Sequence, residues 1–169
     1  MCKMLPQVIR AMNLFADGKG YAGVVEEVLP PKLTLKTEEF KAGGMDAPLE
    51  LDQGMEKLEC NFTVASYEKE LFAAYGLVPG KMINVTLRGA FEQDGETREV
   101  VMVLNGSWKE LDFGTWKSGE KAQLKVVVGL KKFELKIDGE EKVFIDIPNM
   151  VRRINGTDLL EAARKAIGL

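Results

Sequence analysis

Apolar and polar residues alternate along most of the chain, and this alternation predicts a protein built mainly of β-strands. The pattern is clearest over residues 33–64, where three alternating runs surround a glycine-rich bend. An alternating run is typical of a strand with one buried face. The last run places four apolar residues in alternation with polar ones: Leu58, Cys60, Phe62 and Val64. The bend contains Gly43 and Gly44, which tolerate the backbone angles of a turn, and Pro48, which has no N–H to donate to a strand ladder. These residues predict a strand, a loop and a returning strand.

The remaining segments predict further strands and two helices. Residues 8–28 are expected to form a hairpin with an Asp-Gly turn. Residues 66–76 have apolar side chains one helical turn apart, a serine at the start and a glycine at the end, and so predict a helix. A second helix is expected over residues 157–167, where acidic residues lie near the start and basic residues near the end. Shorter strands are predicted at residues 81–91, 97–111 and 143–147.

The longest predicted strand, residues 121–137, contains a change of phase. Its apolar residues are even-numbered up to Leu130 and odd-numbered from Phe133 onwards. One extra residue near Lys131 and Lys132 would produce this shift, which is the effect of a β-bulge. With no internal repeat or linker, residues 1–169 are predicted to form a single, mainly β domain of the sandwich or barrel type with two short helices.

Composition narrows the possible functions. The chain has 23 Lys and Arg against 26 Asp and Glu, a formal net charge of −3, and it contains no histidine. A slightly acidic chain argues against a dedicated nucleic-acid-binding protein, which usually has a basic excess. The lack of histidine removes the commonest general base and the commonest metal ligand. No apolar run approaches the roughly 20 residues needed to span a bilayer, and the N-terminus does not resemble a signal peptide. We therefore expect no membrane anchor and folding in the cytoplasm.

Few residues could support chemistry. Asp46, Glu50 and Asp52 lack the spacing of a calcium loop, and Ser107 has no histidine to activate it. Residues 42–45 lack the following Lys-Ser/Thr pair of a phosphate-binding loop. We accordingly predict neither a catalytic residue nor a bound cofactor or metal.

The two cysteines and the large aromatic residues are expected to have structural roles. Cys60 is in phase with the apolar residues around it and is predicted to be buried, whereas Cys2 lies near the N-terminus. Four aromatic residues are most simply interpreted as core: Trp108, Phe113, Trp116 and Phe133.

The residues by themselves leave two functional readings. A β-rich subunit with open sheet edges and an extended loop carrying Phe40 and Met45 could assemble with further copies into rings. The loop could equally fold back on its own domain. The alternative is a small-molecule-binding β-barrel. The sequence argues against this alternative, because it has few apolar residues beyond those needed for a core.

Several motifs in this chain resemble one protein family. They are residues 31–33, 36–38, 42–48 and 54–58, with 13–15 upstream and 153–156 downstream. Together they resemble the major tail tube protein of contractile-tailed phages and of the related R-type bacteriocins, and the similarity extends over residues 6–168.

The resemblance implies a structural protein rather than an enzyme. It implies six subunits per ring, and rings stacked into a hollow tube inside a contractile sheath. Its partners would be further copies of itself, the tail sheath protein, a baseplate or tube initiator, a tape measure protein and, transiently, DNA in the lumen. The protein would lie in the virion tail, or in a bacteriocin particle that punctures an envelope, after assembly in the host bacterial cytoplasm.

The resemblance and the residue pattern together suggest site residues. A protruding hairpin at about residues 40–56 is expected to reach a neighbouring subunit or ring, with seven interface residues: Phe40, Gly43, Gly44, Met45, Asp46, Pro48 and Met55. The polar faces of the adjoining strands are expected to line the lumen, with four candidates: Glu50, Asp52, Glu59 and Asn61. Negative charge in the lumen would repel a DNA backbone.

Overall fold

The structure is a computed structural model that describes residues 4–76 and 81–169. The described residues form twelve strands and two short helices, which confirms the predicted mainly β class. Cys2 lies outside the described residues. Neither helix in the described part of the chain has the length and apolar character required to cross a membrane.

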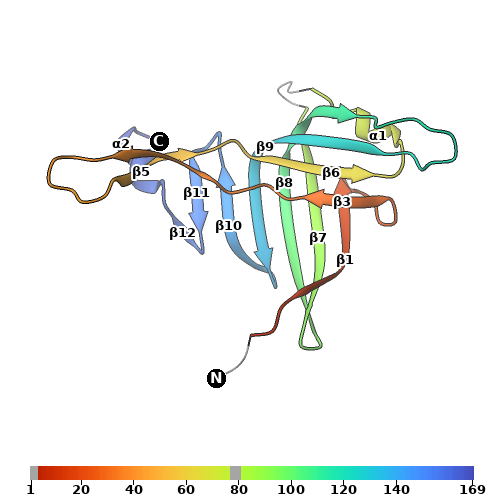
Figure 1. The fold of residues 1–169 in the computed structure, drawn as a ribbon, viewed down its shortest axis with the longest axis horizontal. Coiled ribbons are helices and arrows are strands. Elements are labelled where there is room, and N and C mark those ends of the chain that lie inside the picture. The colour runs from red at the N-terminus through yellow and green to blue at the C-terminus, as the bar shows by residue number, and fades with distance from the viewer. Residues whose placement is uncertain (1–3, 77–80) are drawn as a thin grey trace.

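Most strands belong to one antiparallel sheet (Figure 1). Its main path runs, in order, through β12 (Thr157–Asp158), β11 (Val151–Ile154), β10 (Glu140–Asp146), β9 (Leu124–Ile137), β8 (Glu96–Asp112), β7 (Ile83–Gln93), β1 (Val8–Ala16) and β2 (Lys19–Gly20). Two further strands join it through β9, namely β6 (Glu59–Val64) and β3 (Val25–Leu29). The strands predicted at residues 81–91, 97–111 and 143–147 correspond to β7, β8 and β10.

A β-bulge in β9 lets this sheet fold over on itself. Asn105 of β8 pairs with Lys132, whereas the next residue, Gly106, pairs with Leu130, so Lys131 is the extra residue. The predicted bulge is therefore confirmed. Before the bulge β9 pairs with β6, and after it β9 pairs with β10. As a result β3 and β6 cross over the long strands β1 and β7 (Figure 1).

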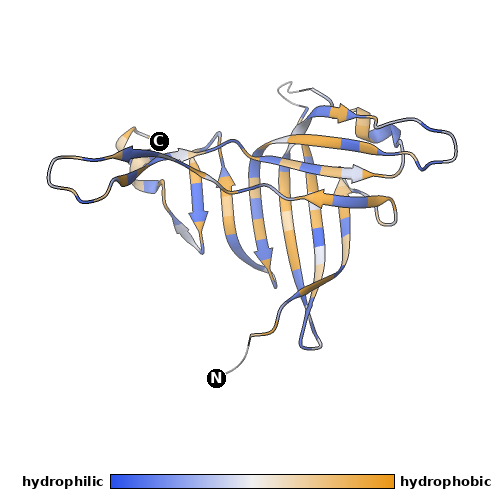
Figure 2. Cartoon of the chain, viewed as in Figure 1, coloured by the Kyte–Doolittle hydropathy of each residue, from blue (hydrophilic) through white to orange (hydrophobic). Residues whose placement is uncertain are grey.

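The core lies between the crossing strands and the long strands. Trp108 is fully buried, makes an edge-to-face contact with Phe62 at 5.5 Å between ring centroids, and donates its indole N–H to the carbonyl of Leu71. Cys60 is fully buried, as predicted, and burial raises the pKa of its thiol to about 12. Hydrophobic and hydrophilic residues alternate along these strands (Figure 2).

The N-terminal hairpin is partly different from the prediction. Asp17 and Gly18 both have positive φ, 50° and 81°, and form a two-residue turn, so the predicted turn is confirmed. The prediction that the returning arm extends to residue 28 is wrong, because within this arm the pairing with β1 stops after the two residues of β2. Tyr21 is buried, and its carbonyl accepts N–H groups from residues 24 and 25, which turns the chain away. The following strand, β3, then pairs with β6.

Both helices are shorter than predicted. Helix α1 covers Lys69–Phe72 rather than residues 66–76, and the Ser66 hydroxyl donates to the Glu68 carboxylate instead of capping the helix. The chain leaves the helix because residues 74 and 76 exchange backbone hydrogen bonds with Trp108 of β8. Strand β8 thus forms hydrogen bonds with backbone groups that a longer helix would have paired internally.

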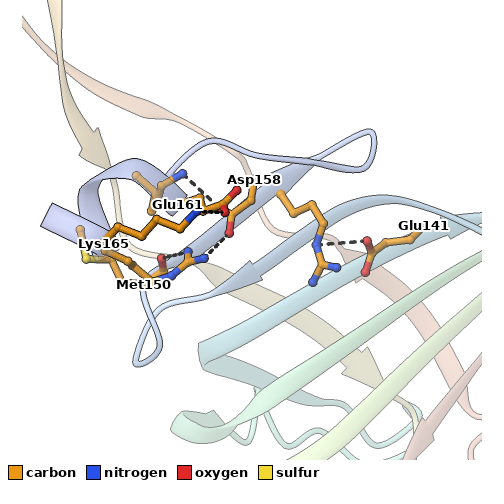
Figure 3. A network of polar contacts seen from close by, with 8 residues as sticks. Glu141, Met150, Asp158, Glu161 and Lys165 are labelled. Carbon is orange, nitrogen blue, oxygen red and sulfur yellow. Dashed lines mark hydrogen bonds and ion pairs between the residues drawn. The ribbon is translucent and has the colours of Figure 1, made fainter. Parts of the chain in front are cut away.

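Helix α2 covers Glu161–Ala166 rather than residues 157–167. Thr157 and Asp158 instead form strand β12, which pairs with β11. The sequence did not predict β12. Arg164 joins these elements, because it donates to the Asp158 carboxylate at 2.5 Å and to the Met150 carbonyl at 2.9 Å (Figure 3). An i,i+4 pair between Glu161 and Lys165 spans the helix itself.

Candidate assembly surfaces

A second, two-stranded sheet projects from the body (Figure 1). It consists of β4 (Leu35–Phe40) and β5 (Leu49–Met55), joined by the loop of residues 41–48. Alternation correctly predicted both strands, but the expected half-burial is wrong, because every residue of β4 and most of β5 are exposed. The hairpin extends beyond the rest of the subunit.

One face of this hairpin carries large apolar side chains near its tip. Phe40 pairs with Leu49, and Glu38 pairs with Leu51. Directly paired residues lie on the same face of an antiparallel sheet, as do residues two apart along a strand. Phe40, Leu49 and Leu51 therefore share one face, here called the apolar face, and they are 50, 53 and 40% exposed. Glu38 lies on the same face, opposite Leu51. The opposite face near the tip carries Glu39 and Glu50.

The base of the hairpin is attached to the body. One carboxylate oxygen of Asp52 accepts the N–H of Gly54 at 2.7 Å, and the other accepts from the guanidinium of Arg152 in β11 at 2.9 Å. These contacts, first the Gly54 hydrogen bond and then Arg152, lower the pKa of Asp52. Met55 is partly buried against the hydrophobic core. Within the part of the chain that the structure describes, these contacts orient the hairpin from its base.

The loop at the tip contains most of the expected interface residues. Gly44 has a φ of +89°, which only glycine adopts readily. Met45 folds back, so that its sulfur lies 3.4 Å from the N–H of Ala42, and it is partly buried within the loop. The other expected interface residues of the loop are exposed: Gly43, Gly44, Asp46 and Pro48.

The four candidate lumen residues lie in two different sheets. Glu50 and Asp52 are on β5, whereas Glu59 and Asn61 are on β6 of the main sheet. Ion pairs offset part of the expected negative charge. Arg152 pairs with Asp52, while Lys109 and Lys57 pair with Glu59 and lower its pKa, Lys109 having the larger effect. The subunit therefore does not bring these residues together on one sheet, and their position in a lumen stays a prediction.

A second exposed surface, which sequence reasoning missed, lies on the β8–β9 side of the molecule. Trp108 and Phe133 are in the core as predicted, but Phe113 is 46% and Trp116 is 80% exposed, so their assignment to the core is wrong. Both lie in the loop between β8 and β9. Trp116 stands among polar and glycine residues without alternation, and that was the available signal.

Tyr67 holds this surface together. The Trp116 indole N–H donates to the Tyr67 hydroxyl at 2.8 Å, and that hydroxyl donates to the Phe113 carbonyl at 2.6 Å. The Phe113 ring packs edge-on against Tyr67 and stacks on Phe72, with centroids 6.0 and 6.1 Å apart. Tyr67, Phe72, Phe113 and Trp116 are here called the aromatic cluster.

The long strands and the neighbouring strands β10 and β11 carry charged residues that form ion pairs. Ion pairs join Arg88 to Glu99 at 2.8 Å and Lys136 to Glu134 at 3.3 Å. Arg153 pairs with Glu141 at 3.5 Å (Figure 3). Among the residues that the structure describes, no three His, Cys, Asp or Glu side chains gather as a metal site would require.

Comparison with known proteins gives the family. The chain matches the family described as phage tail tube protein FII over residues 6–168. It is 36% identical over 173 residues to the tail tube protein of Escherichia phage P2, covering 98% of this chain and 99% of that protein. It is 26% identical over 158 residues to the major tail tube protein of Serratia phage KSP20, covering 92 and 91%.

The fold is similar to a chain in a solved structure of an extracellular contractile injection system, described as the PVC sheath/tube terminator in the extended state. The TM-score is 0.61 at 9% identity, over 78% of this chain and 97% of that one, and this likeness concerns the fold alone. The predicted family and location are confirmed by the two phage relatives and the family match. The chain belongs to the phage tail tube protein FII family, whose place is the tail of the virion.

Proposed function

We propose that this protein is a non-enzymatic structural subunit that assembles with further copies into stacked rings, which form the hollow inner tube of a contractile tail. The observation that carries this proposal is the projecting hairpin β4–β5. Its apolar face leaves Phe40, Leu49 and Leu51 about half exposed on a free subunit. Apolar surface of this kind on a protruding element favours burial against a partner.

Open sheet edges support the same proposal. On one side β3 pairs with β6, and along most of its length β1 pairs with β7 alone. An edge strand presents unpaired N–H and C=O groups, which another chain can complete. Joining edges of neighbouring copies would close a ring, and six copies per ring is the number that the family resemblance implies.

The tube would act as a passive conduit. In a phage tail, DNA would pass through its lumen, and in a bacteriocin particle the tube would puncture an envelope. The sheath protein, a baseplate or tube initiator and a tape measure protein are its proposed partners. The alternative, a small-molecule-binding β-barrel, is less favoured because the interior that would hold a ligand is filled by core side chains such as Phe62 and Trp108.

The test is negative-stain electron microscopy of the purified protein over a range of concentrations, with sonicated tail tubes added as nuclei. We expect rings or hollow rods with a central pore. Deleting residues 42–47 should leave a folded subunit, because this loop lies outside the core, but should abolish rods. Isolated particles from the intact chain under every condition would contradict ring assembly. Normal rods from the deleted chain would contradict the role of the hairpin.

A further inference from the structure

Two of the exposed apolar surfaces in the described part of the chain lie at opposite ends of the longest axis of the molecule. The tip of the β4–β5 hairpin lies at one end and the loop between β8 and β9, residues 113–123, at the other (Figure 1). The first carries the apolar face and the second carries the exposed part of the aromatic cluster. A head-to-tail contact between identical copies requires two different surfaces placed in this way.

The aromatic cluster is built like an interface anchor. Trp116 is 80% exposed, yet its ring is held by the hydrogen bond to Tyr67, which is itself hydrogen-bonded to the backbone at Phe113. A side chain held in place before binding loses little conformational entropy on docking. Tryptophan and tyrosine are also the residues that contribute most often to binding energy at interfaces.

The charged residues around the two surfaces are complementary. Residues 35–55, which include the whole hairpin, carry two lysines and five acidic residues: Glu38, Glu39, Asp46, Glu50 and Asp52. Residues 113–123 carry two lysines, Lys117 and Lys121, and one acidic residue. Lys117 pairs with Glu120 at 3.5 Å and Lys121 pairs with Glu26, while the two lysine side chains stay 72 and 68% exposed. A hairpin of formal charge −3 is attracted weakly to a loop of formal charge +1, whereas two hairpins of the same charge repel each other.

We propose that the apolar face of the hairpin in one copy docks on the aromatic cluster of the next copy, with Trp116 packed against Phe40, Leu49 and Leu51. This proposal rests on the proposed function and names the surface that receives the hairpin. Because each copy carries one of each surface, the contact repeats from copy to copy.

Disulfide trapping tests the pairing. In a Cys2→Ser chain, Leu49→Cys and Trp116→Cys are introduced together, while Cys60 stays in place because it is fully buried. Mild oxidation should give a ladder of oligomers on a non-reducing gel. The two single variants, mixed, should give a cross-linked dimer and nothing longer. A matched control combines Leu49→Cys with Glu96→Cys, at the exposed start of β8 away from both surfaces, and should give no ladder.

A second variant measures how much the Trp116 side chain contributes to the free energy of assembly. Trp116→Ser should raise the protein concentration needed for assembly by about tenfold or more, as expected for loss of an interface hot spot. Its circular dichroism and melting temperature should match those of the unaltered chain, because the side chain is exposed. Rods from the intact chain without a ladder from the doubly substituted chain would overturn this pairing and leave the proposed function standing. Failure of the intact chain to form rings would overturn the proposed function itself.

Discussion

At the scale of single residues, Gly106 shows how little space the centre of the sheet leaves. A Cβ at this position would lie 2.2 Å from the Gly129 carbonyl oxygen and 3.1 Å from the Leu130 Cα. Both are backbone atoms of β9, which cannot rotate away. We expect Gly106→Ala to lower the free energy of unfolding by about 2 kcal/mol or more, measured by urea denaturation.

Gly43→Ala is the matched control for this substitution. A Cβ there has no neighbouring atom within 4 Å, and the stability of the subunit should change by less than about 0.5 kcal/mol. Equal effects of the two substitutions would contradict the close approach of β8 and β9 described here.

A second residue-scale prediction concerns pH. Burial by itself would raise the pKa of Asp146, but hydrogen bonds from the side chain and backbone of Asn149 and the ion pair with Lys132 outweigh it, so the pKa lies below the ordinary 3.8. Since the folded pKa is the lower one, this carboxylate stabilises the fold above the unfolded pKa. The stabilisation is lost as pH falls through the folded pKa.

Asp146→Asn should therefore cost about 1–3 kcal/mol at neutral pH. It should also flatten the decline in stability between the ordinary aspartate pKa and lower pH, as followed by denaturation at a series of pH values. Glu96→Gln, at the exposed start of β8, is the control and should leave the curve unchanged. An unchanged acid curve for Asp146→Asn would refute the assignment.

At the scale of elements, the hairpin β4–β5 behaves as a unit attached at its base. The Asp52–Arg152 contact joins residues a hundred positions apart in sequence, and Met55 is the part of the hairpin that reaches the core. This arrangement holds the direction of the hairpin while leaving its tip free for a partner. A substitution at the base should therefore alter the orientation of the hairpin without changing the stability of the body.

Arg152→Ala tests this separation. We expect amide hydrogen exchange over residues 35–55 to become several-fold faster in the unassembled subunit, because the base of the hairpin loses its ion pair. Exchange in β7 and β8 should stay the same. Arg98→Ala, at an exposed position of β8, is the control. Faster exchange throughout the sheet would mean that Arg152 stabilises the body instead.

At the scale of the whole molecule, the subunit separates a packed body from surfaces suited to assembly. The body buries its aromatic and aliphatic side chains between two crossing sets of strands, whereas the two ends of the long axis expose the apolar face and the aromatic cluster. Assembly through these ends would remove apolar surface from water. Removal of apolar surface has a negative heat-capacity change as its signature.

Calorimetry of assembly should show this signature. When assembled protein is diluted at several temperatures, the heat of dissociation should correspond to a negative heat-capacity change of association. A chain lacking residues 42–47 should give only the heat of dilution. A heat-capacity change near zero for the intact chain would indicate that polar contacts dominate the assembly instead.

Much of the architecture could be predicted from sequence because it depends on local pattern. Alternation located β4 to β10 apart from their ends, and the change of phase between Leu130 and Phe133 located the bulge, because one extra residue reverses the side-chain direction of everything after it. The helix ends could not be predicted. They depend on which backbone groups Trp108 and β11 make available, and those partners are distant in sequence.

The sequence by itself determined the mainly β class, the family and the position of a protruding glycine-rich hairpin. Only the tertiary structure decided which faces are covered. Leu49 and Leu51 alternate with acidic residues just as Phe62 and Val64 alternate with polar ones, yet the first pair is exposed and the second buried. Periodicity fixes the direction of a side chain relative to its own strand, whereas burial depends on what the rest of the chain places opposite that face. The exposure of Trp116 could not be predicted for the same reason. It depends on the conformation of its loop and on Tyr67, which accepts the indole N–H.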